Sequence, residues 1–319
     1  MTNQLKPQPA DGRISAITGS GMTWTDILDP KPSDLDTLAN DYHFHSLDLE
    51  SCLSTEQLTK LEDHEDYFFI MVQIPVQDDQ GLVGCKQVSM FLGKNYLITL
   101  HPSSLHTITT LFQEYSGSAK YRDGLKSSVY LAYRIIDDLT DGISTILDNV
   151  QASLNKIETV VFNEKKSSAR TINLARRQTA TLRRIVYPLG LYIGDLSKAQ
   201  KYSSEDLTIY FSDLRHKVGK ISARIEEMKE IVEIYNDTDF ITSSNRTNTV
   251  LSFLTIIFTL TLPAALVAAI YGMNIPIPGA LVPGALNYFG NYTSLLLIVI
   301  LMLVPTLVMA GYFWRRGWF

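Results

Sequence analysis

The sequence predicts an α+β domain (an α/β sandwich), followed by a long helical stalk and two C-terminal transmembrane helices. Three observations predict this order. Short aromatic and β-branched runs occupy the first 130 residues, and a seam of apolar residues at helical spacing follows them. No Asp, Glu, Lys or Arg occurs between Thr247 and Trp314, whereas charged residues are scattered through everything before that stretch. A length of 319 residues suits two units with different surroundings.

The first 130 residues are expected to hold the α+β domain. Residues 1–20 are polar and rich in Pro, Gly and Ser, so we expect a flexible N-terminus there and the domain over 21–130. Aromatic and β-branched runs bounded by Asp, Gly, Asn or Pro are typical of buried strands. We expect strands at 67–72 and 96–100, a hairpin partner for the second at 88–92, and helices at 33–40 and 103–116.

Long helices are predicted over 131–246. The first carries apolar residues at steps of three and four, namely Ile136, Leu139, Ile143, Ile146, Val150, Leu154, Ile157 and Val161. A second helix follows the polar break 163–168 and is expected to end near Tyr187 and Pro188, because proline interrupts a helix. The third starts near Glu205 and has its own seam, comprising Leu207, Phe211, Leu214, Val218, Ile221, Ile225, Met228 and Val232. No strong breaker follows, so this helix would run into the charge-free stretch for ~100 Å at 1.5 Å per residue, as a stalk does.

Two segments of the charge-free stretch are long enough to cross a bilayer, whose ~30 Å of hydrocarbon needs ~20 helical residues. We expect transmembrane helices at 247–274 and 293–314, joined by a loop at 275–292. The first contains Ser, Thr, Ala and Pro263, whereas the second begins as a nearly pure run of Leu, Ile and Val. Small and hydroxylated residues let membrane helices approach closely or face water. The first segment is therefore expected to face its copies, and the second to face lipid.

The flanking charges predict the orientation in the membrane. Arg246 precedes the first span and Arg315 and Arg316 follow the second, whereas the loop 275–292 has no cation. The positive-inside rule then puts the loop outside and both termini, including the tail 315–319, in the cytoplasm. The N-terminus has no apolar core of a signal peptide, so we expect none to be cleaved. The expected location is the cell (inner or plasma) membrane, as a multi-pass protein.

Composition and motifs argue against several other classes of protein. The net charge of −5 is mild and the basic residues are spread out, so nucleic-acid binding is not expected. Cys52 and Cys85 form no CxxC pattern, as is usual in a reducing cytosol. No Gly-rich phosphate loop and no nucleophile–base arrangement is visible, so we expect neither an ATP-driven pump nor an enzyme. His43 and His45 with His64 lack cysteine support and are expected to be core or surface histidines rather than a zinc site.

The tetrapeptide Tyr271-Gly272-Met273-Asn274 stands at the outer end of the first span. Here the chain resembles the CorA family of magnesium channels, whose signature is Gly-Met-Asn between two C-terminal transmembrane helices. The likeness extends through 245–250 and covers essentially the whole chain. It implies a pentamer with a funnel of cytoplasmic domains, a pore lined by the first span, and passive entry of Mg²⁺ that cytoplasmic Mg²⁺ gates. It also implies a selectivity filter of Gly272, Met273 and Asn274.

The chemistry of Mg²⁺ suits such a filter. Mg²⁺ holds its waters tightly and is rarely stripped by protein ligands alone. A ring of Asn274 amides and Gly272 carbonyls would accept hydrogen bonds from the water shell of the ion without dehydrating it. Taken by itself, Asn274 also suits the plainer role of a helix C-cap.

Stepping back from Gly272 by three and four residues predicts the pore-lining face of the first span. Its members are Asn248, Leu251, Thr255, Phe258, Leu262, Ala265 and Ala269, and the family pattern implicates Leu254 beside or instead of Thr255. The bulky apolar members would form constrictions that gate by dewetting. Ordinary helix packing is the alternative for each apolar position.

The resemblance also implies regulatory carboxylates between subunits. Matching inward from Asn248 without gaps puts Asp213 at the family position of such an aspartate. Asp237, with Asp239, lies near the inner mouth and would attract outgoing cations. Each of these could instead be a solvated helix residue, and Asp78 or Asp79 is the candidate partner in the α+β domain.

The chain departs from the family in the loop 275–292, which contains no carboxylate where family members often have an acidic residue after the motif. Capture of cations at the outer mouth is therefore left to neutral ligands. One alternative function is transport of Zn²⁺, Co²⁺ or Ni²⁺, with or without proton coupling, although the spans hold no ionisable residue that would favour coupling to protons. The other is a membrane-anchored metal sensor or scaffold that conducts nothing.

Overall fold

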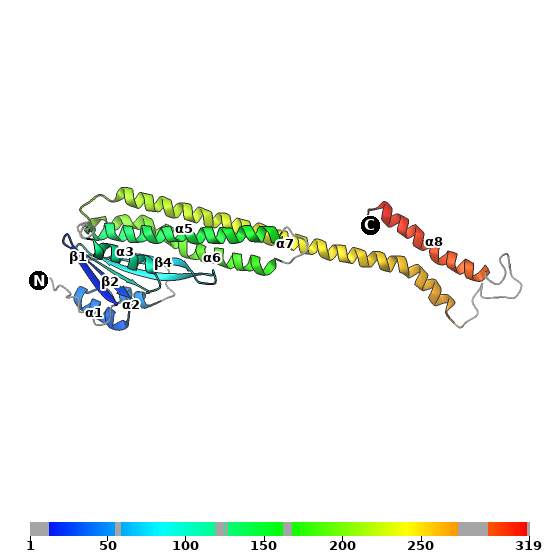
Figure 1. Cartoon of the computed structure of the whole chain (residues 1–319), viewed down its shortest axis with the longest axis horizontal. Helices are drawn as coiled ribbons and strands as arrows, with labels where there is room; N and C mark the ends of the chain where they lie inside the picture. The colour runs from blue at the N-terminus through cyan, green and yellow to red at the C-terminus, as the bar shows by residue number, and fades with distance from the viewer. Residues whose placement is uncertain are drawn as a thin grey trace. The chain divides into compact units, whose positions relative to one another are not determined.

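The structure is a computed structural model (Figure 1). It describes residues 13–54, 59–118, 125, 127–161, 168–273 and 293–317. The chain divides into two compact units, Met1–Asp237 and Thr238–Phe319. One helix, α7 (Thr208–Tyr271), contributes residues to both units, and each unit is described below by itself.

The first unit contains a six-stranded sheet in the order β1-β2-β6-β5-β4-β3. Its strands are β1 (Ile14–Gly19), β2 (Met22–Leu28), β3 (Lys60–Asp63), β4 (Phe68–Gln77), β5 (Val83–Leu92) and β6 (Tyr96–His101). Neighbouring strands are antiparallel except β2 and β6, which are parallel. The predicted hairpin joins β5 to β6, with Leu92 opposite Leu97. Gly93 is required in its turn, because a Cβ there would lie 2.2 Å from the ring of Tyr96.

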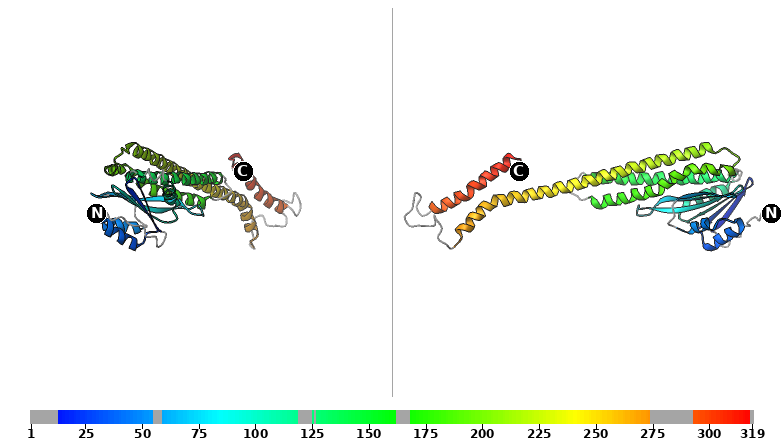
Figure 2. Two further views of the ribbon diagram at one scale, coloured as in Figure 1. Left: turned by 60° about the vertical axis from the view of Figure 1, so that its left-hand side comes forward. Right: turned by 180° about the vertical axis from the view of Figure 1, so that it is seen from behind.

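Helices cover both faces of the sheet, which Figure 2 shows edge-on between them. On β4 the side chains alternate, with Phe68, Ile70 and Val72 in one apolar cluster and Phe69 and Met71 in the other. The smaller cluster packs under α1 (Pro32–Tyr42) and α2 (Ser46–Leu53). The larger one packs under α3 (His106–Gly117), α5 (Ser128–Val161), α6 (Ala169–Tyr192) and the 3₁₀ helix η1 (Ile193–Tyr202). The first unit is thus the α/β sandwich that the sequence predicts.

The long helices bury the apolar seams that their spacing predicts. Every predicted seam residue of α5 is buried, and so is every one from Leu207, just before α7, to Val232. The two helices lie side by side, since Arg224 of α7 donates to Asp148 of α5 at 2.7 Å. The seam therefore holds this bundle together, as amphipathic helices of a globular unit require.

Two predictions about the first unit are wrong. Residues 14–19 form β1 instead of part of a flexible N-terminus, because their six pairs with β2 complete the edge of the sheet. The helix α6 does not end at Pro188 but continues to Tyr192 and then into η1. Pro188 removes one backbone bond, and the burial of Leu189, Ile193 and Leu196 in the larger cluster offsets that loss.

The second unit consists of the rest of α7 and α8 (Thr293–Arg315). Its apolar side chains are mostly exposed, in contrast to the first unit; among the described residues only Ile256 and Phe313 are buried apolar ones. Thr306 of α8 donates to the backbone carbonyl of Leu260 in α7 at 3.3 Å. The loop predicted at 275–292 lies outside the described residues.

Candidate functional site

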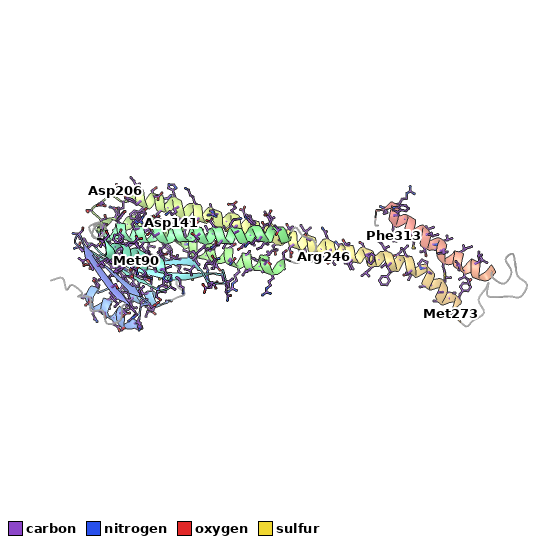
Figure 3. All side chains as sticks on the ribbon, in the orientation of Figure 1. Met90, Asp141, Asp206, Arg246, Met273 and Phe313 are labelled. Carbon is purple, nitrogen blue, oxygen red and sulfur yellow. The ribbon has the colours of Figure 1, made fainter. Side chains whose placement is uncertain are left out.

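Two helices are long and apolar enough to cross a membrane. They are α7 and the stretch Leu296–Arg315 of α8, and each has only 6% of its most apolar window buried. A core helix of a soluble protein would be mostly buried, and a signal sequence would lie near the N-terminus. Neither description fits these helices, which are the last two of the described chain. Figure 3 labels Arg246, the last charged residue of α7, and Met273, at the far end of the apolar segment.

The predicted pore-lining residues of α7 are all exposed in the second unit. They are Asn248, Leu251, Leu254, Thr255, Phe258, Leu262, Ala265 and Ala269. Phe258 and Leu262 are the most exposed of the large apolar ones, at 67% and 64%. The buried or half-buried positions between Ile256 and Val267 lie on another face, because Ile256 is about 200° around the helix from Phe258. The second unit itself therefore leaves the predicted pore face open.

Hydroxyl groups within this apolar segment are satisfied by their own helix. Thr255 donates to the carbonyl of Leu251 at 2.7 Å, and Thr261 donates to that of Ile257 at 2.9 Å. Such bonds let Ser and Thr lie in a membrane helix without an unpaired donor. The helix also contains Pro263, and Figure 1 shows it bending in its last, orange part, as a proline that removes a helical hydrogen bond predicts.

The helix ends at the predicted filter. The amide of Gly272 donates to the carbonyl of Ala268 at 2.9 Å, and the amide of Met273 donates to that of Ile270 at 3.2 Å, so the last turn tightens. A Cβ on Gly272 would lie 3.0 Å from the Ala268 oxygen, which makes glycine the residue that fits this close approach. Met273 is 54% exposed. Asn274, the third predicted filter residue, lies outside the described residues.

In the first unit, Asp213 lies beside a group of acids that the sequence analysis missed. Asp137, Asp138 and Asp141 of α5 bring one carboxylate oxygen each within 4.8 Å of one another, and we call them the three-aspartate cluster. Tyr210, one turn before Asp213, contacts the ring of Tyr133, one turn before Asp137. These three aspartates stand at positions i, i+1 and i+4 next to an apolar seam, and this spacing could have indicated the cluster from the sequence.

Basic side chains already neutralise part of this cluster. Lys217, one turn after Asp213, binds Asp137, and it binds Asp141 at 2.8 Å. Arg134 binds Asp138 at 3.2 Å. Burial alone would lower the pKa of Lys217, but its bonds to the two aspartates outweigh that and raise the pKa above its usual value.

Burial and nearby charges also raise the pKa values of two groups at this cluster. Burial raises the pKa of Asp138, against the opposing charge of Arg134. Burial, with the charges of Asp137 and Asp213, raises the pKa of Tyr133. Asp213 is itself exposed on α7, and its negative charge acts together with that of Asp137 on the hydroxyl of Tyr133.

The other predicted carboxylates lie elsewhere. Asp237 is exposed and lines a surface hollow together with Arg176, Arg183, Lys229 and Glu233. Asp78 caps the turn between β4 and β5, where its Oδ1 accepts hydrogen bonds from the amides of Gln80 and Leu82. The carboxylate of Asp78 is therefore engaged within its own turn. The carboxylate near Asp213 is instead that of Asp137, which binds Lys217, one turn after Asp213 on α7.

The histidines fulfil part of the expectation for them. His43 ends α1 in the left-handed conformation, and the Nδ1 atom of His45 accepts the amide of Leu47 at the start of α2. Both are therefore helix caps. His64 differs, because it joins Asp48 and Glu62 in a second group with metal-ligand spacing.

With this geometry in view, the comparison with known families identifies the chain. Residues 19–316 match the family model described as CorA-like Mg²⁺ transporter protein. The chain belongs to this family. It is therefore a divalent cation transporter by family, with an α+β unit, a long helix and two C-terminal apolar helices, and not a member of an enzyme family.

Individual relatives agree with the family assignment. The chain is 28% identical over 323 aligned residues to the cobalt/magnesium transport protein CorA of Thermotoga maritima, which covers 99% of this chain and 88% of that protein. Among solved structures, the complete CorA magnesium transporter of Methanocaldococcus jannaschii matches with a TM-score of 0.78 at 20% identity, over 94% of this chain and 92% of that one. The full-length CmaX protein matches with a TM-score of 0.71 at 18% identity, over 91% and 88%. At such identities the two structures support the fold alone.

Proposed function

We propose that this CorA-family chain is a subunit of a pentameric channel that passes hydrated Mg²⁺ into the cell. Five copies of the α7 apolar segment surround the pore, both termini are cytoplasmic, and cytoplasmic Mg²⁺ closes the channel. The observation that carries the proposal is the exposed, charge-free face of α7 that ends at Gly272 and Met273. A face of Asn, Thr, Leu, Phe and Ala that its own unit leaves uncovered needs partners, and copies of itself around a water-filled path supply them.

The driving force is the membrane potential. A divalent cation that crosses 100 mV, negative inside, gains about 4.6 kcal/mol, twice the ~2.3 kcal/mol of a single charge. No nucleotide hydrolysis is required. The selectivity filter acts on the hydration shell through the carbonyl of Gly272 and the amide of Asn274, because stripping water from Mg²⁺ is too costly for neutral ligands.

Regulation uses the acids of the first unit. Asp213 and the three-aspartate cluster concentrate negative charge at one place along α5 and α7, and Lys217 and Arg134 offset only part of it. Cytoplasmic Mg²⁺ bound there, with a carboxylate of the next subunit, holds the subunits in the closed arrangement. When internal Mg²⁺ falls, the uncompensated acids repel each other and the closed arrangement loses stability.

The metal carried is the main point to test, because a relative's name includes cobalt as well as magnesium. The purified full chain is reconstituted in liposomes, and the entry of Mg²⁺, Co²⁺, Ni²⁺ and Zn²⁺ is followed with an imposed potential, with and without a pH gradient. We expect Mg²⁺ entry that follows the potential and is indifferent to the gradient. Faster Zn²⁺ entry that collapses without the gradient would contradict the proposal and support a proton-coupled transition-metal transporter. No divalent current at any internal Mg²⁺ concentration would indicate a sensor or scaffold.

A further inference from the structure

A second group of potential metal ligands lies on the opposite side of the sheet from the three-aspartate cluster. It comprises Asp48 on α2, Glu62 on β3 and His64 just after β3. One donor atom from each lies within 4.8 Å of the other two. Asp48 is fully buried, with an exposure of 0%. We call these residues the His64 group.

Lys60 binds one oxygen of each carboxylate of this group. Its ammonium lies 3.2 Å from Oδ1 of Asp48 and 2.9 Å from Oε1 of Glu62. The Nε2 atom of His64 faces the other oxygen of each carboxylate, 2.8 Å from Oδ2 of Asp48 and 3.5 Å from Oε2 of Glu62. One oxygen of each carboxylate is thus held by the lysine, and the remaining oxygen of each points to the histidine side.

The imidazole of His64 is held in place but its Nε2 atom has no hydrogen-bond partner. The ring stacks on Tyr67 with a centroid distance of 4.4 Å, and the backbone carbonyl of the residue accepts Lys201 at 2.9 Å and Tyr202 at 3.1 Å. Nε2 is buried, and its approach to Asp48 is close in distance without the alignment of a hydrogen bond. The Nε2 atom and the carboxylate oxygen are therefore close to each other but not aligned for a hydrogen bond. This arrangement is expected of two ligand atoms that bind the same metal ion.

The spacing matches that of ligands on one metal ion. Two atoms that each lie ~2.1 Å from a shared ion are about 3.0 Å apart in octahedral and about 3.4 Å apart in tetrahedral geometry. The distances from Nε2 to the two carboxylate oxygens, 2.8 and 3.5 Å, fall around these values. The hydroxyl of Tyr67 donates to Oδ2 of Asp48 at 2.8 Å, as groups behind a metal ligand commonly do.

We propose that the His64 group is a binding site for a transition-metal dication, of the Co²⁺, Ni²⁺ or Zn²⁺ class, in the α+β unit. One imidazole nitrogen and two carboxylate oxygens form a three-ligand face, with water in the remaining positions. Imidazole favours these ions over Mg²⁺, which prefers oxygen ligands alone. Two carboxylates against one ammonium leave the group negative when His64 is neutral, so a dication is attracted there. The site therefore distinguishes transition metals from the Mg²⁺ that the proposed channel carries, and it does not depend on conduction.

The test is a Co²⁺ titration of the full chain in detergent, with excess Mg²⁺ present to fill sites made of oxygen ligands only. Visible absorption reports bound Co²⁺, and X-ray absorption at the cobalt edge reports an imidazole ligand. His64→Ala removes the nitrogen, and Glu62→Gln weakens an oxygen ligand at a side chain that is 42% exposed and tolerates the change. The matched control is His45→Ala, which removes the neighbouring ring, 6.1 Å away, that is outside the group.

We expect wild type and His45→Ala to bind Co²⁺ in the presence of Mg²⁺ with an imidazole ligand. Glu62→Gln should weaken this binding by about 10- to 100-fold, and His64→Ala should weaken it at least as much. Melting curves check that each variant folds, and Glu62→Gln gives the answer if His64→Ala does not fold. Binding that His64→Ala and Glu62→Gln leave unchanged, or wild type without Mg²⁺-resistant Co²⁺ binding, would overturn the site and leave a simple ion-pair network. Because no flux is measured, a chain that conducts nothing would still show the site.

Discussion

The helix α7 behaves as two different helices along one chain. Before Asp237 it buries an apolar seam, and its outer face carries charged side chains such as Arg224, paired with Asp148 of α5. After Arg246 it carries no charge at all, and its large apolar side chains are mostly exposed. The stretches share one backbone geometry, so the difference lies in what surrounds each of them.

The comparison shows where each stretch finds its partners. The first is covered by helices of its own unit, so its apolar residues stabilise the fold of a single chain. The second has Ile256 as its one buried large apolar residue among the described residues, and in the proposed channel lipid and other copies of the chain cover the rest. Substitutions in the first stretch should therefore change stability, and those in the second should change transport.

The largest effect on transport is expected at the filter residue that follows the second stretch in the sequence. Asn274→Ala removes an amide from every subunit of the proposed filter, and a hydrogen bond to an ion's water shell is comparable to one with a charged group, about 1.5–3 kcal/mol. Mg²⁺ entry into liposomes should fall by at least about tenfold, while the oligomer stays intact by size-exclusion chromatography. Asn287→Ala, an equally conservative change in the predicted loop 275–292, should leave entry unchanged. Unaltered Mg²⁺ entry and selectivity in Asn274→Ala would make this residue a helix cap only.

A leucine pair on α7 tests the comparison directly. Leu214 is fully buried in the first unit, whereas Leu262 is 64% exposed in the second. Leu214→Ala should lower the free energy of unfolding of the first unit by about 2–5 kcal/mol, because it leaves a cavity in a packed core. Leu262→Ala should leave that free energy unchanged and raise the divalent current, since it widens an apolar constriction. Hydrogen exchange of α5 and α7 amides measures the first quantity, and electrical recording measures the second. Equal destabilisation by both changes would refute the comparison.

An intermediate effect is expected at the acids beside the buried stretch. Asp213→Lys supplies a fixed positive charge where Mg²⁺ would bind, so the closed form should persist at low internal Mg²⁺. Asp213→Ala removes both repulsion and ligand, so the response should be blunted instead of locked. The shift in either case should correspond to about 1–3 kcal/mol of coupling. Protection of α7 from protease with and without Mg²⁺ reports the equilibrium, and Ser212→Ala is the control. Identical protection in wild type and both Asp213 variants would leave Asp213 a solvated helix residue.

The sequence predicted those parts of the fold that repeat at short range. The α5 and α7 seams follow a period of three and four residues, and the hairpin of β5 and β6 has its turn residues in place. The edge strand β1 could not be predicted, because it is short, its residues are exposed or half-exposed, and only pairing with β2 makes it a strand. Pro188 misled the prediction for α6, since tertiary burial outweighed one lost hydrogen bond.

The candidate sites show the same limit. The filter residues were implied by the resemblance to the family, and the pore face follows from helical steps back from Gly272; the structure leaves that face exposed in the second unit. The three aspartates of the cluster are close together along α5 itself, but their position beside Tyr210 and Lys217 depends on α5 lying beside α7. The His64 group combines residues from α2 and from the end of β3. Contacts between elements distant in sequence depend on the fold, and spacing along the chain does not report them. His64 shows this best, because its sequence neighbourhood gave no reason to expect Asp48 beside it.

The smallest expected effect concerns pH, and it is expected in the first stretch of α7, because the second has no charged side chain after Arg246. The pKa of Lys217 is raised in the folded chain, since the bonds to Asp137 and Asp141 outweigh the cost of burial. A raised lysine pKa contributes stability that is fully present below the unfolded value of 10.5 and is lost as pH rises through the folded value. Lys217→Met should therefore be less stable than wild type near neutral pH, and the difference should shrink above pH 10.5. The side chain is 27% exposed, so solvent screening should keep the difference below about 1 kcal/mol.

Urea unfolding at a series of pH values measures this difference in the free energy of unfolding. Lys220→Met, which changes an exposed lysine on the same helix, is the control. A difference that stays constant through the alkaline range would mean that the stabilising contact of Lys217 is its packed methylene chain and not its charge.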